Sequence, residues 1–163
     1  MAMVEVAFTP LPAHVRTARL VAVAVARRSG VAESLLDEVR LAVGEACSRA
    51  VEAHRLYCPA EPVKIELTAS GGRFEVVVTD SAPAEPAAIG AVAPAGLAAD
   101  PVPAGAAAAG AQMAGAATAN GHGGLQDGLG LAVIAELADD VKISRTPAGI
   151  SVCMSWPSSV GEP

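Results

Sequence analysis

The chain has 163 residues, a formal net charge of −6 and a hydrophobic fraction of 52%, with aromatic residues at only 2%. This length is enough for one domain with its own core. An acidic balance without a lysine- or arginine-rich run excludes direct nucleic-acid binding through phosphate neutralisation.

The apolar segments are too short for a membrane helix, which needs about 18 unbroken apolar residues. The segment that begins at Leu20 ends at Arg27 and Arg28. The first residues also lack the basic and then apolar pattern of a secretory leader. We therefore expect no membrane association and a cytoplasmic location.

The N-terminal part predicts one strand and two helices. Val4 to Thr9 alternates apolar and polar residues, as a half-buried strand does, and Pro10 follows it. His14 to Arg28 has the apolar content of a buried helix. A second helix is predicted to start near Ser34, with Ser34 as its N-cap and Asp37 three residues later.

The second helix has two distinct faces at helical spacing. Its apolar stripe consists of Leu35, Leu36, Val39, Ala42, Val43, Ala46 and Ala50. Its polar residues Glu38, Glu45, Arg49 and Glu52 are expected on another face.

The rest of the chain predicts two hairpins and a third helix around a long loop. Val63 to Thr68 and Arg73 to Asp80 flank a Ser-Gly-Gly turn, which is typical of a hairpin. Residues 129–138 have a helical pattern, and strands at 141–144 and 150–156 form a second hairpin around Pro147 to Gly149.

The segment 83–124 differs from everything around it. Alanine, glycine and proline supply 18, 8 and 5 of its 42 residues, and Glu85 and Asp100 are its only charges. Such a composition offers little apolar surface to offset the entropy of ordering, so we expect a low-complexity lid loop or linker.

The element order predicts the α+β fold class for a single domain over residues 1–163. Because the strands cluster in hairpins, we expect a mixed, mostly antiparallel sheet with helices on one face, a two-layer sandwich. The cysteines Cys47, Cys58 and Cys153 lack metal-ligand spacing, and we expect reduced, mostly buried thiols. The histidines His14, His54 and His122 are interpreted as structural or surface residues.

Four sequence stretches together resemble the RsbW/SpoIIAB family of anti-sigma factors, which belongs to the histidine-kinase-like ATPase superfamily. They are Leu36 to Val51, the hairpin end at Asp80, the glycine turn Asp127 to Ile134, and Leu137 to Val141. The resemblance covers nearly the whole chain outside 83–124. It implies the α/β sandwich of histidine-kinase-like ATPases.

The resemblance also implies roles for individual residues. Glu45 matches the glutamate that is the general base in active kinases. Asp80 matches the aspartate that recognises the adenine amino group, although Ser81, Ala82 and Pro83 replace the glycines that normally follow.

Two further sets of residues are carried over in the same way. The turn Gly128, Leu129, Gly130 and Leu131 matches the second glycine box, whose backbone amides approach phosphates at a helix N-terminus. Arg16 and Arg19 lie on the first helix, where family members present an arginine to their partners.

Position 49 departs from the family pattern, because arginine replaces the asparagine that binds Mg²⁺. A guanidinium has no acceptor atom and repels the cation. We therefore interpret Arg49 as a substitute for the metal that pairs with phosphate oxygens. A simple solvated Glu45–Arg49 helix pair is the alternative interpretation.

Three functions remain open from the sequence. The first is an anti-sigma-like regulator that binds a STAS-type anti-anti-sigma factor, a sigma factor, or both. It is inactive as a kinase and takes a nucleotide diphosphate or nucleotide sugar without Mg²⁺. The second is an active serine/threonine protein kinase that uses ATP, and the third is a ligand-free interaction scaffold. Family members also commonly form homodimers.

Overall fold

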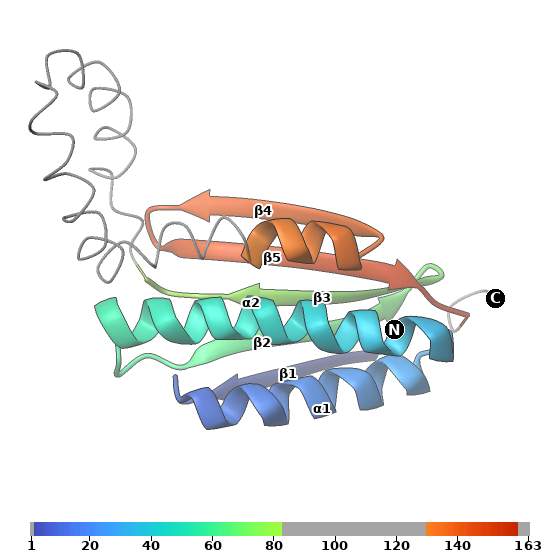
Figure 1. Ribbon diagram of the computed structural model, residues 1–163, viewed down its shortest axis with the longest axis horizontal. Coiled ribbons are helices and arrows are strands. Elements are labelled where there is room, and N and C mark those ends of the chain that lie inside the picture. Colours follow the sequence, from blue (N-terminus) through green and yellow to red (C-terminus); the bar gives the residue numbers. More distant parts are fainter. Residues whose placement is uncertain (1, 83–129, 160–163) are drawn as a thin grey trace, which may run out of the picture. The chain divides into compact units, whose positions relative to one another are not determined.

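The computed structural model describes residues 2–82 and 130–159 of the chain. The elements, in chain order, are β1 (Ala2–Phe8), α1 (Pro12–Arg28), the 3₁₀ turn η1 (Glu33–Leu35), α2 (Leu36–Tyr57), β2 (Val63–Ser70), β3 (Arg73–Thr79), a helix over residues 130–137, β4 (Asp140–Thr146) and β5 (Gly149–Pro157) (Figure 1). The loop predicted at 83–124 lies outside the described residues.

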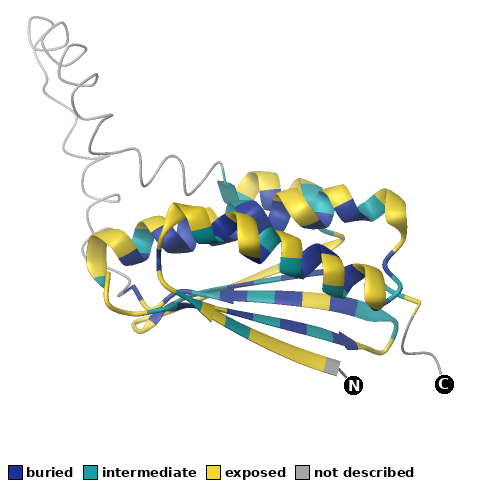
Figure 2. Ribbon diagram, turned by 90° about the horizontal axis from the view of Figure 1, so that it is seen from below, coloured by how far each residue is buried: buried dark blue, intermediate teal, exposed yellow. Residues whose placement is uncertain are grey.

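Within the described residues, five strands form one sheet with the order β1-β2-β3-β5-β4. Every neighbouring pair is antiparallel, which confirms the predicted antiparallel character. The described sheet has no parallel pair, so it is not a mixed sheet. The helices lie on one face of this sheet (Figure 2). The predicted α+β sandwich is therefore confirmed, and α2 crosses the middle of the sheet against β2, β3 and β5.

Helix α1 follows from the residues at its two ends. Pro12 occupies its first turn, where the missing N–H is not needed, and the helix therefore begins earlier than the predicted His14. It stops before Gly30, whose φ of 77° is a left-handed conformation suited to glycine. Its buried side chains are small: Val15, Ala18, Ala22, Val23 and Ala26.

Helix α2 confirms the predicted apolar stripe and corrects its start. All the stripe residues from Leu36 to Ala50 are buried, and Leu35 is half-buried. Ser34 lies inside η1 instead of capping α2, and the helix start has no side-chain cap. Arg49 was predicted on the polar face, but it is only 7% exposed.

Both hairpins turn over two residues. Gly71 and Gly72 connect β2 to β3 with φ angles of 56° and 73°, the conformation that a tight primed turn requires. Pro147 and Ala148 connect β4 to β5, and Gly149 follows them with a φ of 145°.

The core lies between the sheet and the helices. Its largest fully buried side chains include Trp156, Phe74, Ile65, Leu67, Ile134 and Met154. The helix over 130–137 contributes Ile134 to this core. The indole N–H of Trp156 donates to the Leu137 carbonyl at 3.1 Å, which fixes the end of that helix against β5. Across the described ranges, no helix combines the length and the apolar character needed to cross a bilayer.

The three cysteines are free thiols, as predicted, but only Cys47 is fully buried. Burial raises the pKa of the Cys47 thiol to about 12, and the positive charge of Arg19 acts in the opposite direction. Cys58 and Cys153 are half-buried. Burial also raises the pKa of each of these two thiols, with added repulsion from Asp80 and Glu61 at Cys58 and from Glu75 at Cys153.

We expect the two leucines Leu36 and Leu41, both in α2, to respond very differently to truncation. Leu36 is 3% exposed and Leu41 is 54% exposed. Leu36→Ala should lower the free energy of unfolding by about 2–5 kcal/mol, and Leu41→Ala by about 0.5 kcal/mol or less. Urea unfolding followed by circular dichroism measures both, and equal losses would contradict the described burial.

Thiol alkylation should separate the cysteines. The thiolate is the reactive form, so at pH 8 Cys47 is the least reactive in the native chain because its pKa is about 12. Iodoacetamide followed by peptide mass spectrometry should find Cys58 and Cys153 labelled first, and Cys47 only after unfolding. Cys47→Ser should leave the native labelling unchanged. Rapid native labelling of Cys47 would contradict its burial.

Candidate functional site

The candidate site is built around Asp80, which directly follows β3. Its backbone N–H donates to the Ile150 carbonyl at 2.9 Å and so continues the pairing of β3 with β5. Its side-chain Oδ1 accepts the backbone N–H groups of Ala82 at 3.1 Å and of Ile150 at 3.2 Å. Asp80 is 1% exposed, so its carboxylate is fixed by the sheet and hidden from solvent.

The other carboxylate oxygen of Asp80 binds Arg49. Arg49 Nη2 lies 2.6 Å from Asp80 Oδ2, and the two side chains are 5% and 0% exposed. The partners come from α2 and the end of β3, 31 positions apart in sequence. A charge-assisted hydrogen bond of this length in a buried environment is strong. Removal of one partner from such a pair typically costs about 3–5 kcal/mol, because the remaining charge is left buried.

Arg49 also carries an unused donor. Its Nε is buried and has no hydrogen-bond partner among the described residues. A buried donor without an acceptor costs about 1–3 kcal/mol. Such a group in a native structure requires an explanation, and an acceptor from outside the described residues is one.

His54 fixes the segment that follows Asp80. The imidazole is completely buried; its Nδ1 lies 2.8 Å from the Glu61 carbonyl, and its Nε2 accepts the Ser81 backbone N–H at 2.8 Å. The Ser81 bond requires an unprotonated Nε2, so Nδ1 carries the proton and donates to Glu61. The neutral ring thus connects α2 to both the loop before β2 and the residue after Asp80.

Gly149 has no side chain, and the space that a Cβ would fill is occupied by Asp80. A Cβ built on Gly149 would lie 1.9 Å from the Asp80 backbone oxygen and 3.2 Å from its Oδ1. Its φ of 145° is also a conformation that side-chain-bearing residues rarely adopt. Only glycine at this position lets β5 approach Asp80 closely enough for the Ile150 bonds.

Glu45 lies one turn before Arg49 on α2, but the two do not form the ion pair of the alternative interpretation. The guanidinium bonds to Asp80 instead, because Asp80 is buried at the sheet and within reach of the long side chain. Glu45 is half-buried and points toward Gly130: a Cβ built on Gly130 would lie 3.7 Å from Glu45 Oε2.

The glycine box is described only in part. Gly130 and Leu131 are the first described residues of the helix over 130–137, and both are half-buried. Gly128 and Leu129 lie outside the described residues. The structure therefore brings Glu45 together with Gly130, and Arg49 together with Asp80.

Position 49 does not fit a magnesium ion. A guanidinium offers no acceptor atom, and here it is committed to Asp80. Mg²⁺ needs oxygen ligands in an octahedral arrangement. Within residues 2–82 and 130–159, no cluster of three or more histidine, cysteine, aspartate or glutamate side chains is placed to hold a metal.

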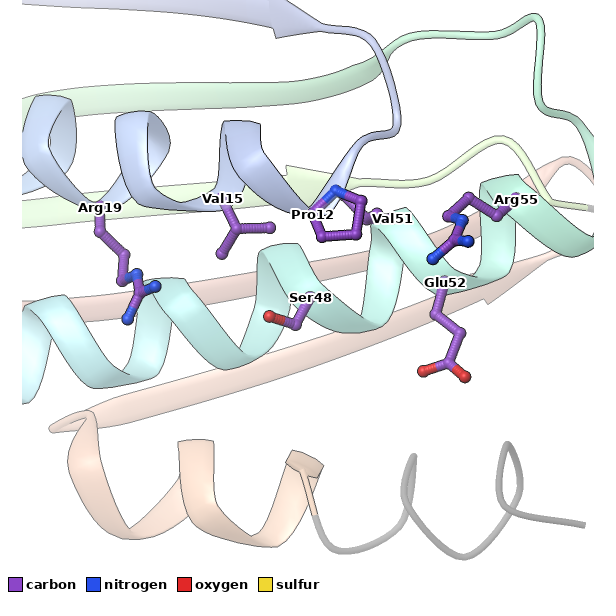
Figure 3. A pocket seen from close by; sticks show the side chains of 7 residues that line it. All are labelled: Pro12, Val15, Arg19, Ser48, Val51, Glu52 and Arg55. Atoms are coloured by element: carbon purple, nitrogen blue, oxygen red, sulfur yellow. The ribbon is translucent and has the colours of Figure 1, made fainter. Parts of the chain in front are cut away.

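Arg16 and Arg19, the predicted partner-binding residues, lie on α1 away from Asp80. Arg16 is exposed and Arg19 is half-buried. The Arg19 side chain passes over Gly44 of α2, where an added Cβ would lie 2.7 Å from Arg19 Cδ. Arg19 lines a pocket of about 320 Å³ between α1 and α2, together with Ser48, Glu52 and Arg55 (Figure 3).

The sequence predicts Glu45, Arg49 and Asp80 as candidate site residues, but it does not predict the contacts of His54 and Gly149 that hold them. His54 was interpreted as structural or surface, and its bond to Ser81 was not foreseen. The sequence places Gly149 in a turn, and it does not reveal that Gly149 also lies against Asp80 and so lets β5 approach β3. Neither contact has a local sequence signal, because each partner lies in a distant part of the chain.

Comparison with known proteins places these observations in a family. Residues 8–156 match the sequence profile of the histidine kinase-like ATPase domain. A crystal structure of the RsbU and RsbW domains of a Mycobacterium tuberculosis protein resembles the chain with a TM-score of 0.59 and 13% identity. The match covers 99% of this chain and 35% of that one, and at this identity it concerns the fold. A search of curated proteins found no match.

Gly149→Ala should disrupt the Asp80 anchor far more than Gly71→Ala disrupts its turn. Both glycines have positive φ, but a Cβ on Gly71 meets nothing within 4 Å, whereas one on Gly149 collides with Asp80 backbone. Gly71→Ala should cost about 1–2 kcal/mol from the left-handed backbone alone. The free energy of unfolding in urea should fall by clearly more for Gly149→Ala, and similar losses for the two variants would contradict the close approach.

Proposed function

We propose a regulatory function for this chain, which belongs to the family of histidine kinase-like ATPase domains. Within that family it is a protein of the RsbW/SpoIIAB type, an anti-sigma-like protein of the cytoplasm. It binds a STAS-type anti-anti-sigma factor, a sigma factor, or both. It does not act as a kinase, and a nucleotide diphosphate or nucleotide sugar bound without Mg²⁺ controls it.

The observation that carries this proposal is the buried Arg49–Asp80 ion pair. Phosphoryl transfer depends on a metal that bridges the phosphates and neutralises the developing charge. Arginine at position 49 removes a metal ligand and introduces a positive charge at the same place. Asp80 compensates this charge within the protein, and a site with this residue lacks the means to move a phosphoryl group efficiently.

Glu45 supports the same conclusion. A general base must reach the hydroxyl of a protein substrate beside the bound phosphates. The Glu45 carboxylate is half-buried and directed at Gly130. Without an adjacent metal to orient the phosphates, this carboxylate has no productive partner, so regulation through binding is the better supported role.

A second candidate, a ligand-free scaffold, is favoured by one specific observation. Asp80, the fully buried carboxylate of the site, already has the guanidinium and two backbone N–H groups as partners within the chain. The scaffold differs from the first proposal in showing no response to any nucleotide.

The partner surface is proposed on α1, from the exposed Arg16 to the half-buried Arg19. The neighbouring pocket between α1 and α2 adds Arg55, Glu52 and the hydroxyl of Ser48 to this region. The arginines outnumber the single glutamate, which favours a partner that presents acidic side chains. A homodimer in solution is part of the same proposal and follows from the family type.

Arg49→Asn should convert the protein toward an ATP-dependent kinase. An amide oxygen restores a metal ligand at position 49 and leaves Asp80 with its two backbone hydrogen bonds. The test incubates each protein with radiolabelled ATP, Mg²⁺ and purified STAS-domain proteins from the same genome, and measures transferred phosphate. We expect Arg49→Asn to exceed the wild type by at least about tenfold.

The matched control is Arg40→Asn, which makes the same change at an exposed position of the same helix. It should remain as inactive as the wild type. Phosphate transfer by the wild type at the rate of Arg49→Asn would overturn the kinase-inactive proposal. Surface plasmon resonance with the same STAS proteins tests partner binding separately, and loss of binding on Arg19→Ala is expected.

A further inference from the structure

Two strands form the edges of the described sheet, β1 on one side and β4 on the other. Each of them pairs with a single neighbour, so one row of backbone N–H and C=O groups in each strand has no strand partner within the described part of the chain. Such a row can pair with a further strand unless the side chains of the edge oppose it.

The two edges differ in their side chains. β4 presents exposed charged side chains along its length, namely Asp140, Lys142 and Arg145. Charges on an edge strand disfavour pairing with other chains. β1 has Glu5 as its single charged residue, and beside it Met3 is 57% exposed and Val4 36%. Figure 2 shows this exposure along the strand that ends at the label N, so β1 is the less protected edge.

The apolar side of β1 faces a groove. Val4, Val6 and Phe8 lie opposite buried residues of β2 and therefore face the helices. Glu5 and Ala7 face the other side of the sheet, because side chains alternate along a strand. A groove of about 360 Å³, lined by Val6 and Phe8, lies between β1 and the first part of α1. A strand added at this edge brings its own apolar side chains beside this groove if its apolar side also faces the helices.

We infer that a second copy of this chain pairs its β1 antiparallel with this β1, so that one sheet continues through the dimer. The inference rests on the homodimer of the proposed function and assigns a surface to it. The strand is complementary to itself when a two-fold axis passes at Val6, since each contact then occurs twice. Val6 lies opposite the second copy's Val6, and Val4 opposite its Phe8. On the other side of the sheet, Glu5 lies opposite Ala7.

Other registers are less favourable. With the axis at Glu5, the two Glu5 side chains face each other, although Glu5 already lies opposite Glu66 within its own sheet. Like charges directly opposite are destabilising. With the axis at Val4, Phe8 has no partner in the second β1. A register shifted by one residue turns the apolar side of one strand away from the helices.

Position 7 tests this register through charge. Ala7 is exposed, and in the dimer each Ala7 lies opposite a Glu5. Ala7→Lys should lower the dissociation constant of the dimer by roughly 2- to 30-fold, because two pairs of opposite charge form, and Ala7→Glu should raise it by a similar factor. Sedimentation equilibrium of the full chain measures both constants.

Two controls separate this effect from folding. Within its own sheet Ala7 lies opposite Lys64, so Ala7→Glu gains a favourable pair there and Ala7→Lys an unfavourable one. Urea unfolding of the monomer at low concentration should therefore rank the two variants in the reverse order. Ser144 is exposed in the same cross-strand row at the β4 edge, and Ser144→Glu and Ser144→Lys should leave the dimer constant unchanged.

Cysteine cross-linking locates the axis. Val6→Cys places two thiols directly opposite each other, whereas Glu5→Cys places them diagonally and farther apart. The background carries Cys58→Ser and Cys153→Ser, and Cys47 is kept because it is buried. Oxidation with copper phenanthroline should convert Val6→Cys into covalent dimers well before Glu5→Cys.

The outcomes distinguish the surface from the dimer itself. A chain that stays monomeric overturns the homodimer and this inference together, while surface plasmon resonance with STAS proteins still decides partner binding. A dimer that ignores the charge at position 7, or that links faster through Glu5→Cys, overturns pairing at β1 and leaves the homodimer intact. A dimer that responds to Ser144→Glu has its contact at β4, which overturns the inference as well.

Discussion

The buried ion pair between Arg49 and Asp80 is the interaction on which the rest of the site depends. It joins the central helix α2 to the junction of β3 and β5, in surroundings almost without solvent. Two charges are costly to bury, and here Arg49 and Asp80 compensate each other while two backbone N–H groups complete the partners of Asp80. One contact therefore connects the helix to the sheet at the centre of the candidate site. A substitution at either residue changes this connection and the site together.

The surrounding residues restrict the pair to one geometry. Gly149 allows β5 to approach, and the neutral His54 ring holds the residue after Asp80. Apolar residues of similar volume often stabilise a core as well as a buried ion pair does. The specific effect of the pair is to hold the Arg49 guanidinium and the Asp80 carboxylate in one arrangement between α2 and the end of β3.

Sequence patterns predicted the fold more completely than the site, for a physical reason. The apolar stripe of α2 and the glycine turn at Gly71 depend on local spacing, and both are confirmed. Arg49 was predicted on a polar face because helical periodicity places its Cα there. The periodicity does not reveal how far a long side chain reaches, or that Asp80 lies within that reach. The capping role of Ser34 was also wrong, because a 3₁₀ turn precedes α2.

The position of β5 has a consequence for biosynthesis. This strand is the last of the described elements in the chain, yet it lies inside the sheet between β3 and β4. A nascent chain that has left the ribosome only as far as β3 exposes the edge that β5 will occupy, and it lacks the Trp156 side chain. Unpaired edges and exposed apolar surface promote association with other chains. The emerging domain is therefore vulnerable until β5 appears, and chaperone protection has the greatest value before that point.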